Sequence, residues 1–145
     1  MTPAGPSAAL ARPPVPVPDA LTQFFWDGVA DGRLLILRCT ACGFFVHWPR
    51  PICPRCSCEE LRPEQVSGRG VLDTFTIPLQ PYHPYFAARV PYVLGVVELA
   101  EQRHLKLVTN VVDCPPEEVT VGMPLQVVFR QVAPGLTLPL FAPAS

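Results

Sequence analysis

Charge is scarce in this chain and nearly balanced. Only 16% of the 145 residues are Asp, Glu, Lys or Arg, the formal net charge is -1, and Lys106 is the only lysine. Proteins that bind nucleic acid present clustered positive charge to the phosphates. The composition therefore argues against a nucleic-acid partner.

Long apolar runs are also missing. No segment reaches the roughly 20 consecutive apolar residues of a membrane helix, and the N-terminus has no basic start followed by an apolar core. Mean hydropathy is nevertheless +0.27. We therefore expect a cytoplasmic protein without membrane contact, which covers part of its apolar surface with another protein.

Cysteine is abundant and unevenly spaced, with six in the chain and no accompanying secretion signal. Four of them form two close pairs, Cys39-x2-Cys42 and Cys53-x2-Cys56, separated by ten residues. Such pairs in an intracellular chain indicate a metal site rather than a disulfide framework. We predict that these four thiolates hold one Zn²⁺, with Cys58 as the alternative to Cys56.

Four sulfur ligands fill the tetrahedral shell of zinc and leave no position for a reactive water. The predicted zinc is therefore structural, and we predict no catalytic residue. Iron in the same site would make a rubredoxin-like electron carrier, which is one alternative. Cys114, His83 and His104 have no evident catalytic partner in the sequence.

The remaining pattern predicts a mainly β protein in three parts. Residues 1–18 are rich in proline and alanine and are expected to form a disordered tail. Residues 19–66 are expected to form an N-terminal helix capped by Asp19, with Leu21, Phe25 and Val29 on its apolar face, followed by a rubredoxin-like zinc ribbon.

Residues 67–145 are expected to form a five-stranded OB-fold barrel. The predicted strands are 68–77, 92–99, 104–112, 122–132 and 136–141, and a one-turn helix is predicted at 115–119. A short helix between the third and fourth of five strands is the OB-fold order. A small β-sandwich is the competing interpretation.

One loop, residues 78–91, is long for a compact barrel and therefore a candidate for function. It carries Tyr82, His83 and Arg89, and Tyr92 follows directly. These side chains either border a binding face or cover the mouth of the barrel. The aromatic segments "FFW" at 24–26 and "FFVHW" at 44–48 are likewise either a local core or a docking face.

The order of segments from about residue 24 to 144 resembles one known family. The segments are "FFWDGVADGRLLILRCTACG", "PRPICPRC", "SGRGVLDTFTI", "PYVLGVVEL", "LVTNVV", "VGMPLQVVF" and "LPLFAPA". They are similar to the acyl-CoA-associated zinc-ribbon/OB-fold proteins catalogued as domain of unknown function thirty-five. The proline-rich tail and the loop 78–91 lie outside the diagnostic segments.

This resemblance implies a stand-alone accessory subunit that is not an enzyme by itself. Family members bind thiolase-like enzymes that act on CoA thioesters, and the partner carries the catalytic groups. The resemblance thus implies a hetero-oligomer around a thiolase dimer. From the chemistry of the loop itself we expect acyl-CoA or the partner near Tyr82, His83, Arg89 and Tyr92, because arginine pairs with phosphates and aromatic rings stack on adenine or cover an acyl chain.

Three functions follow as expectations from these observations. The preferred one is retro-aldol cleavage of steroid side chains by the complex. An alternative is an acyl-CoA channelling subunit between acetoacetyl-CoA thiolase and hydroxymethylglutaryl-CoA synthase. A second alternative is nucleic-acid binding, because zinc ribbons and OB-folds also occur in that class.

Overall fold

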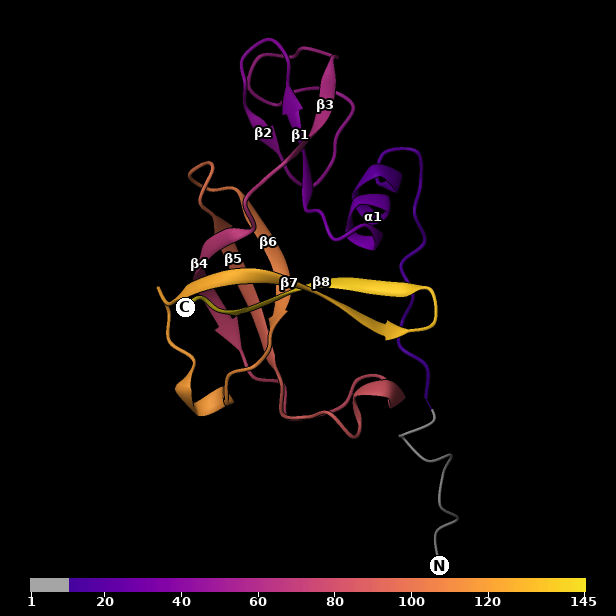
Figure 1. Ribbon diagram of the computed structural model, residues 1–145, viewed down its shortest axis with the longest axis vertical. Helices are drawn as coiled ribbons and strands as arrows, with labels where there is room; N and C mark the ends of the chain where they lie inside the picture. The colour runs from indigo at the N-terminus through magenta and orange to yellow at the C-terminus, as the bar shows by residue number, and fades with distance from the viewer. Residues whose placement is uncertain (1–10) are drawn as a thin grey trace, which may run out of the picture.

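The computed structural model describes residues 11–145 and places a small sheet and one helix at one end of a β-barrel (Figure 1). Of the predicted disordered tail, residues 1–10 lie outside the described residues, and residues 11–18 contain no helix or strand. Within the described part of the chain, no helix is long and apolar enough to cross a membrane.

The helix is α1, Gln23–Ala30. It begins later than predicted, because Asp19 caps the turn that precedes it: the Asp19 carboxylate accepts a hydrogen bond from the Leu21 N–H at 3.0 Å. Phe25 and Val29 are buried as expected. Leu21 was expected on the same face but lies before the helix and is 41% exposed.

A three-stranded antiparallel sheet forms the ribbon, in the order β2-β1-β3. Its strands are β1 Leu35–Cys39, β2 Phe45–Val46 and β3 Leu61–Gln65. Strand β3 was not expected from the sequence, because its side chains are mostly exposed and include Pro63. Proline is tolerated there because β3 is an edge strand that pairs only with β1.

The predicted five-stranded OB-fold is confirmed: five strands close a barrel in the order β4-β5-β6-β8-β7. Short 3₁₀ turns, η2 and η3, lie between β4 and β5 and between β6 and β7, η3 at the predicted helical turn. The bounds are β4 Arg69–Thr76, η2 Pro84–Phe86, β5 Val93–Leu99, β6 Lys106–Val111, η3 Pro116–Glu118, β7 Pro124–Ala133 and β8 Leu136–Pro143.

The helix, the ribbon and the barrel share one hydrophobic core. Phe25 of α1, Phe45 of β2 and Leu107 of β6 belong to the same buried cluster. A side-chain amide joins the two sheets as well. Gln102 Oε1 accepts from the Phe45 N–H at 2.8 Å, and Gln102 Nε2 donates to the Phe45 carbonyl at 3.0 Å.

The barrel has one weak seam, between β6 and β8, where the only register pair is Val111 with Phe141. The next step of this parallel ladder would pair Thr109 with Pro139 and would need a backbone N–H at residue 139. Proline has none. The Thr109 hydroxyl instead donates to the Pro139 carbonyl at 3.1 Å. On the N-terminal side of Val111 in β6 and of Phe141 in β8, no register pair therefore joins the two strands.

Candidate metal centre and ligand cavities

The four predicted cysteine sulfurs lie together in the ribbon. The Sγ atoms of Cys39, Cys42, Cys53 and Cys56 are all within 4.8 Å of one another. Two sulfur–sulfur distances are 3.5 Å, from Cys39 to Cys56, and 3.7 Å, from Cys42 to Cys53. A tetrahedral zinc with bonds of about 2.3 Å separates its sulfurs by about 3.8 Å. The spacing therefore fits one tetrahedral ion.

Two tight turns bring the sulfurs together. After the first pair, the Gly43 N–H donates to the Cys39 carbonyl at 3.0 Å, and Gly43 has a φ of 75°, which glycine adopts without strain. After the second pair, the Ser57 N–H donates to the Cys53 carbonyl at 2.9 Å.

The backbone N–H of Cys42 lowers the pKa of Cys39 to about 6 although burial opposes it, so this cysteine is held as a thiolate, the form that binds a metal. The backbone N–H of Cys58 does not offset the Cys39 sulfur and burial, which raise the pKa of Cys56 to about 12, so this cysteine has to release its proton when a metal binds.

Cys58, the alternative ligand, is held outside this group. Its Sγ accepts a hydrogen bond from the Glu60 N–H at 3.4 Å. Cys114 lies far along the chain, and burial followed by the charges of Glu118 and Glu117 raises the pKa of its thiol. The structure thus groups Cys56 rather than Cys58 with the other three sulfurs.

Four aromatic rings from the helix and the ribbon form a second feature. The Phe25 ring lies 5.1 Å from Trp26, 5.8 Å from His47 and 5.5 Å from Trp48, between centroids. The His47 and Trp48 rings are 4.9 Å apart. Phe25 is 2% exposed and Trp48 is 49% exposed, so the cluster runs from the core to the surface.

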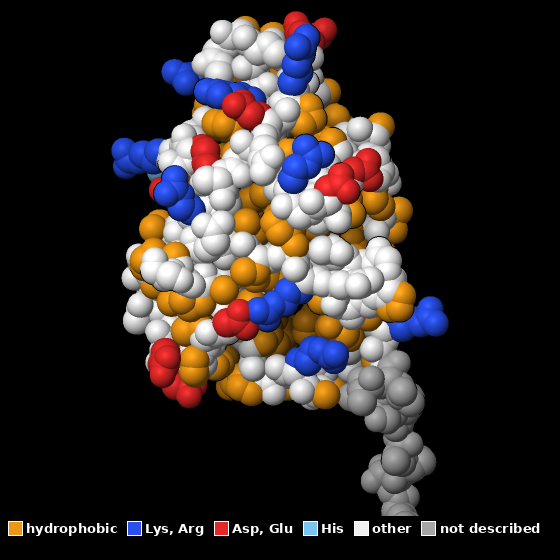
Figure 2. All heavy atoms as spheres, viewed as in Figure 1, with side chains coloured by type: hydrophobic (Ala, Val, Ile, Leu, Met, Phe, Trp, Pro, Cys, Tyr) orange, Lys and Arg blue, Asp and Glu red, His pale blue; other side chains and the backbone are white. Residues whose placement is uncertain are grey.

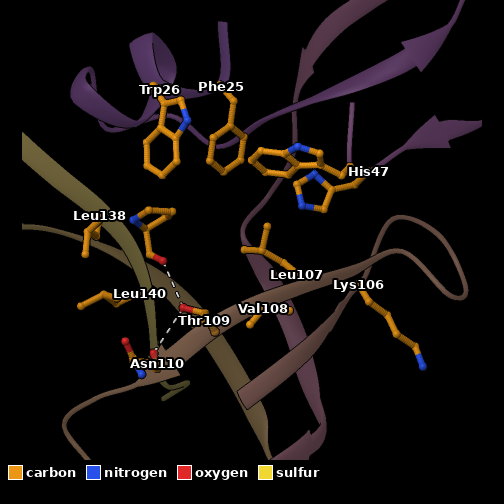
Figure 3. Close-up of a pocket in the computed structure, with 12 residues that line it drawn as sticks. Phe25, Trp26, His47, Lys106, Leu107, Val108, Thr109, Asn110, Leu138 and Leu140 are labelled. Carbon is orange, nitrogen blue, oxygen red and sulfur yellow. Dashed lines mark hydrogen bonds between the residues drawn. The ribbon is translucent and has the colours of Figure 1, made fainter. Parts of the chain in front are cut away.

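The rings form one wall of a cavity of about 530 Å³, which we call the seam cavity (Figure 3). The opposite walls come from β6 and β8, at the place where these strands separate. Its lining residues are Phe25, Trp26, His47, Trp48, Lys106, Leu107, Val108, Thr109, Asn110, Leu138, Pro139 and Leu140.

A second cavity of about 390 Å³, the loop cavity, lies under the loop 78–91. It is lined by Pro13, Pro14, Tyr85, Phe86, Arg89, Tyr92, Asn110, Val111, Val112, Val132, Leu138 and Leu140. The Phe86 and Tyr92 rings stack at 5.0 Å. The Arg89 guanidinium lies 3.7 Å from the centre of the Tyr85 ring, and its Nη1 donates to the Tyr85 carbonyl at 2.7 Å.

The structure separates the four residues predicted for the acyl-CoA or partner surface. Arg89 and Tyr92 line the loop cavity, whereas Tyr82 and His83 do not. Tyr82 is 87% exposed. His83 Nδ1 accepts from the Tyr85 N–H at 3.1 Å and so caps the short turn η2.

Sequence reasoning missed the seam cavity. The segments "FFW" and "FFVHW" did carry a signal, since three of their aromatic residues line it together with His47. Neither segment reveals the other walls, because those come from β6 and β8, more than fifty residues further along the chain. Pro139 was the remaining clue, as a proline inside an expected strand.

Two family models match the chain. The ChsH2 rubredoxin-like zinc ribbon domain matches residues 26–62, and the ChsH2 C-terminal OB-fold domain matches residues 63–130. Among solved structures, the chain is similar to one from an Ltp2-ChsH2(DUF35) aldolase, with a TM-score of 0.83 and 34% identity over 90% of this chain and 100% of that chain.

A DUF35-family protein of unknown function from Sulfolobus solfataricus shows the same fold, with a TM-score of 0.61 at 14% identity over 86% of each chain. A probable enoyl-CoA hydratase alpha subunit from Thermomonospora curvata is 35% identical over 139 residues, which is 96% of this chain. The chain spans 41% of the length of that relative.

A DUF35 domain-containing scaffold protein from Methanocaldococcus jannaschii is 32% identical over 79% of this chain and 80% of its own length. Both parts of the fold, the zinc ribbon and the OB barrel, are thus matched by family models and by relatives aligned over most of this chain. The chain belongs to the DUF35 family and carries its ChsH2-type zinc ribbon and OB-fold domains.

Proposed function

We propose that this chain is the non-catalytic accessory subunit of a thiolase-like enzyme that acts on acyl-CoA thioesters, helping complex assembly and acyl-CoA binding. The observation that carries the proposal is the likeness to the chain of an Ltp2-ChsH2(DUF35) aldolase, at 34% identity over the whole of that chain. Retro-aldol cleavage of a steroid side chain is the reaction we assign to the complex.

The chemistry of the described residues supports a non-catalytic role. The four clustered sulfurs fit Zn²⁺, and a zinc held by four thiolates is saturated and supports the fold rather than a reaction. Outside the ribbon, the raised pKa of Cys114 keeps this thiol protonated and weakly nucleophilic at neutral pH. Such a site needs reduced cysteines, in keeping with the expected cytoplasmic location.

The surface supports a partner. Exposed apolar side chains include Leu79, Val108 and Val121, at 74%, 69% and 64% exposure. Figure 2 shows hydrophobic side chains gathered on the barrel half of the visible face. Where exposed apolar side chains are contiguous, they are typical of interaction sites.

The loop cavity is the place where we propose that acyl-CoA is contacted. Stacked aromatic rings, Phe86 on Tyr92, give it an apolar interior. Arg89 lies at the same cavity with most of its guanidinium N–H groups uncommitted, since one of them serves the Tyr85 carbonyl. Arginine donates charge-assisted hydrogen bonds to phosphate oxygens, and the CoA part of an acyl-CoA ester carries such phosphates.

A second candidate is a scaffold that channels acyl-CoA between an acetoacetyl-CoA thiolase and hydroxymethylglutaryl-CoA synthase. It is favoured by the archaeal relatives named scaffold proteins, one of them 35% identical and from Pyrococcus furiosus. Nucleic-acid binding, the third expectation, is disfavoured by the net charge of -1.

Co-purification tests the assembly. The chain is co-expressed with a thiolase-like protein, and the pair is analysed by size exclusion with light scattering. We expect one hetero-oligomer whose acyl-CoA cleavage requires both chains. Turnover of CoA thioesters by this chain alone would contradict the proposal, as would separate elution of the two proteins.

An alanine substitution tests the acyl-CoA contact. In the complex, Arg89→Ala is expected to weaken acyl-CoA binding by about 10-fold to 100-fold, because a charged hydrogen bond to phosphate contributes about 1.5–3 kcal/mol. The control is Arg103→Ala, an exposed arginine that does not line the loop cavity. Isothermal titration of the complex measures both. Unchanged affinity in the Arg89 variant would exclude this contact.

A further inference from the structure

The seam cavity has the size of a small-molecule site and is open to solvent on one side, where Trp48 and Val108 are exposed. Its volume of about 530 Å³ lies in the range of about 300–1,000 Å³ that ligand pockets occupy. Four separate elements build it, namely α1, the ribbon, β6 and β8 (Figure 3). Two of these elements, β6 and β8, share only one register pair, and the residue where the next pair would form, Pro139, has no backbone donor.

The walls carry no uncompensated charge. Lys106, the one lysine, donates from Nζ to the Asp73 carboxylate at 2.9 Å. Thr109 uses its hydroxyl on the Pro139 carbonyl, and Asn110 donates from Nδ2 to the Val93 carbonyl at 3.0 Å. Lys106 and Thr109 are thus paired within the protein, whereas the Oδ1 of Asn110 has no hydrogen-bond partner among the described residues.

His47 is different from the other polar side chains of the cavity. Burial lowers its pKa to about 4, so the ring is neutral at physiological pH. Among the described residues its ring has no hydrogen-bond partner in the protein, whereas it packs on the rings of Phe25 and Trp48. A neutral imidazole has one donor and one acceptor. The cavity therefore offers aromatic and aliphatic surface with a few neutral hydrogen-bonding groups, which are the His47 ring, the indole N–H groups of Trp26 and Trp48, and the Oδ1 of Asn110.

We propose that the seam cavity is a binding site for an uncharged, largely apolar small molecule or group that carries a hydroxyl or carbonyl, with His47 as its hydrogen-bond partner. The apolar body of the ligand would lie between the aromatic wall and the side chains of Leu107, Leu138 and Leu140. The inference is independent of the proposed accessory role, because the site is complete within this chain.

The chain contains its own reporters for this site. It has two tryptophans, Trp26 and Trp48, and both line the seam cavity. The full chain is titrated with adamantan-1-ol, an uncharged apolar cage with one hydroxyl, and with adamantane-1-carboxylate, the matched anion. We expect a saturable blue shift of tryptophan emission with the alcohol, and binding of the anion weaker by about tenfold or more because an unpaired charge is costly to bury.

A matched pair of variants locates the binding. Val108 lines the cavity and Val121 does not, yet they are similarly exposed at 69% and 64%, so neither substitution should impair folding. Val108→Glu is expected to weaken alcohol binding by about tenfold, and Val121→Glu to leave it unchanged. His47→Phe, which keeps a ring, is expected to weaken it about threefold to tenfold.

Three results would overturn the inference. They are the absence of a saturable emission change, equal affinity for the alcohol and the anion, and equal effects of the two valine substitutions. Failure of His47→Phe to change the affinity would overturn the assigned hydrogen bond and with it the hydroxyl or carbonyl of the ligand. If the free chain does not bind the alcohol, and binding of the thiolase-like partner shields Trp26 and Trp48 from solvent, the cavity is a protein-docking site instead. None of these results bears on whether the complex forms.

Discussion

At the scale of residues, one backbone turn distinguishes Cys56 from Cys58, the two candidates for the fourth zinc ligand. Ser57 has a φ of 65°, and its N–H closes a turn onto the Cys53 carbonyl. The chain then reverses, so that the Cys53 N–H donates to the Cys58 carbonyl at 2.9 Å. This backbone bond fixes Cys58 beside the second pair while its sulfur turns toward Glu60.

A serine substitution separates the two candidates. Cys56→Ser should abolish stoichiometric zinc binding, because a hydroxyl is a poor substitute for a thiolate ligand. Cys58→Ser is the matched control and should retain about one zinc per chain. Metal analysis by mass spectrometry on the purified proteins measures both. The reverse order of zinc contents would show that Cys58, and not Cys56, completes the site.

Individual residues also show which parts of the two candidate sites could be predicted from the sequence and which could not. The spacing within each cysteine pair is local, so it predicted the four sulfurs that the structure brings together. Tyr82 and His83 were predicted from their loop alone, and neither lines the loop cavity. Their positions depend on the turn η2, whose capping by His83 could not be read from composition.

At the scale of elements, alternation of buried and exposed side chains made the barrel predictable. In β5, inward Val93 and Val97 alternate with more exposed neighbours, as a period of two requires. β3 has no such pattern, because its side chains lie largely in solvent and its order comes from pairing with β1. Binding cavities between elements depend on the packing of distant segments and were not predictable.

A proline substitution tests the origin of the seam. Pro139→Ala supplies a backbone N–H that faces β6, so the ladder can extend by one step and the new amide should exchange slowly with solvent. The control is Pro63→Ala in the edge strand β3, where the new N–H faces away from β1 and should exchange quickly. Hydrogen exchange followed by NMR measures both. Equally fast exchange at the two positions would show that something other than the missing donor holds the strands apart.

At the scale of the whole molecule, the ribbon and barrel behave as parts of one core. Residues of α1, β2 and β6 belong to a single buried cluster, and Gln102 spans the two sheets with a pair of hydrogen bonds to Phe45. The proposed division at residues 66 and 67 stays a prediction. The shared core favours cooperative unfolding of the two halves.

Removing the amide bridge tests this coupling. Gln102→Ala leaves the half-shielded N–H and C=O of Phe45 without protein partners, so we expect a loss of about 1–3 kcal/mol in the free energy of unfolding. Gln131→Ala, at an exposed position of β7, is the control and should change it by less than about 0.5 kcal/mol. Urea denaturation measures both. Two separate transitions in the unmodified chain would contradict a shared core.

The two cavities are separated by very little protein, since Asn110, Leu138 and Leu140 line both of them. A ligand that displaces either leucine from one side changes the shape of the other cavity. Thermodynamic linkage then requires that each occupant alter the affinity of the other by the same factor. Binding of a ligand in the seam cavity would thus change the affinity of the loop cavity for its own ligand, because the side chains of β8 form a wall that both cavities share.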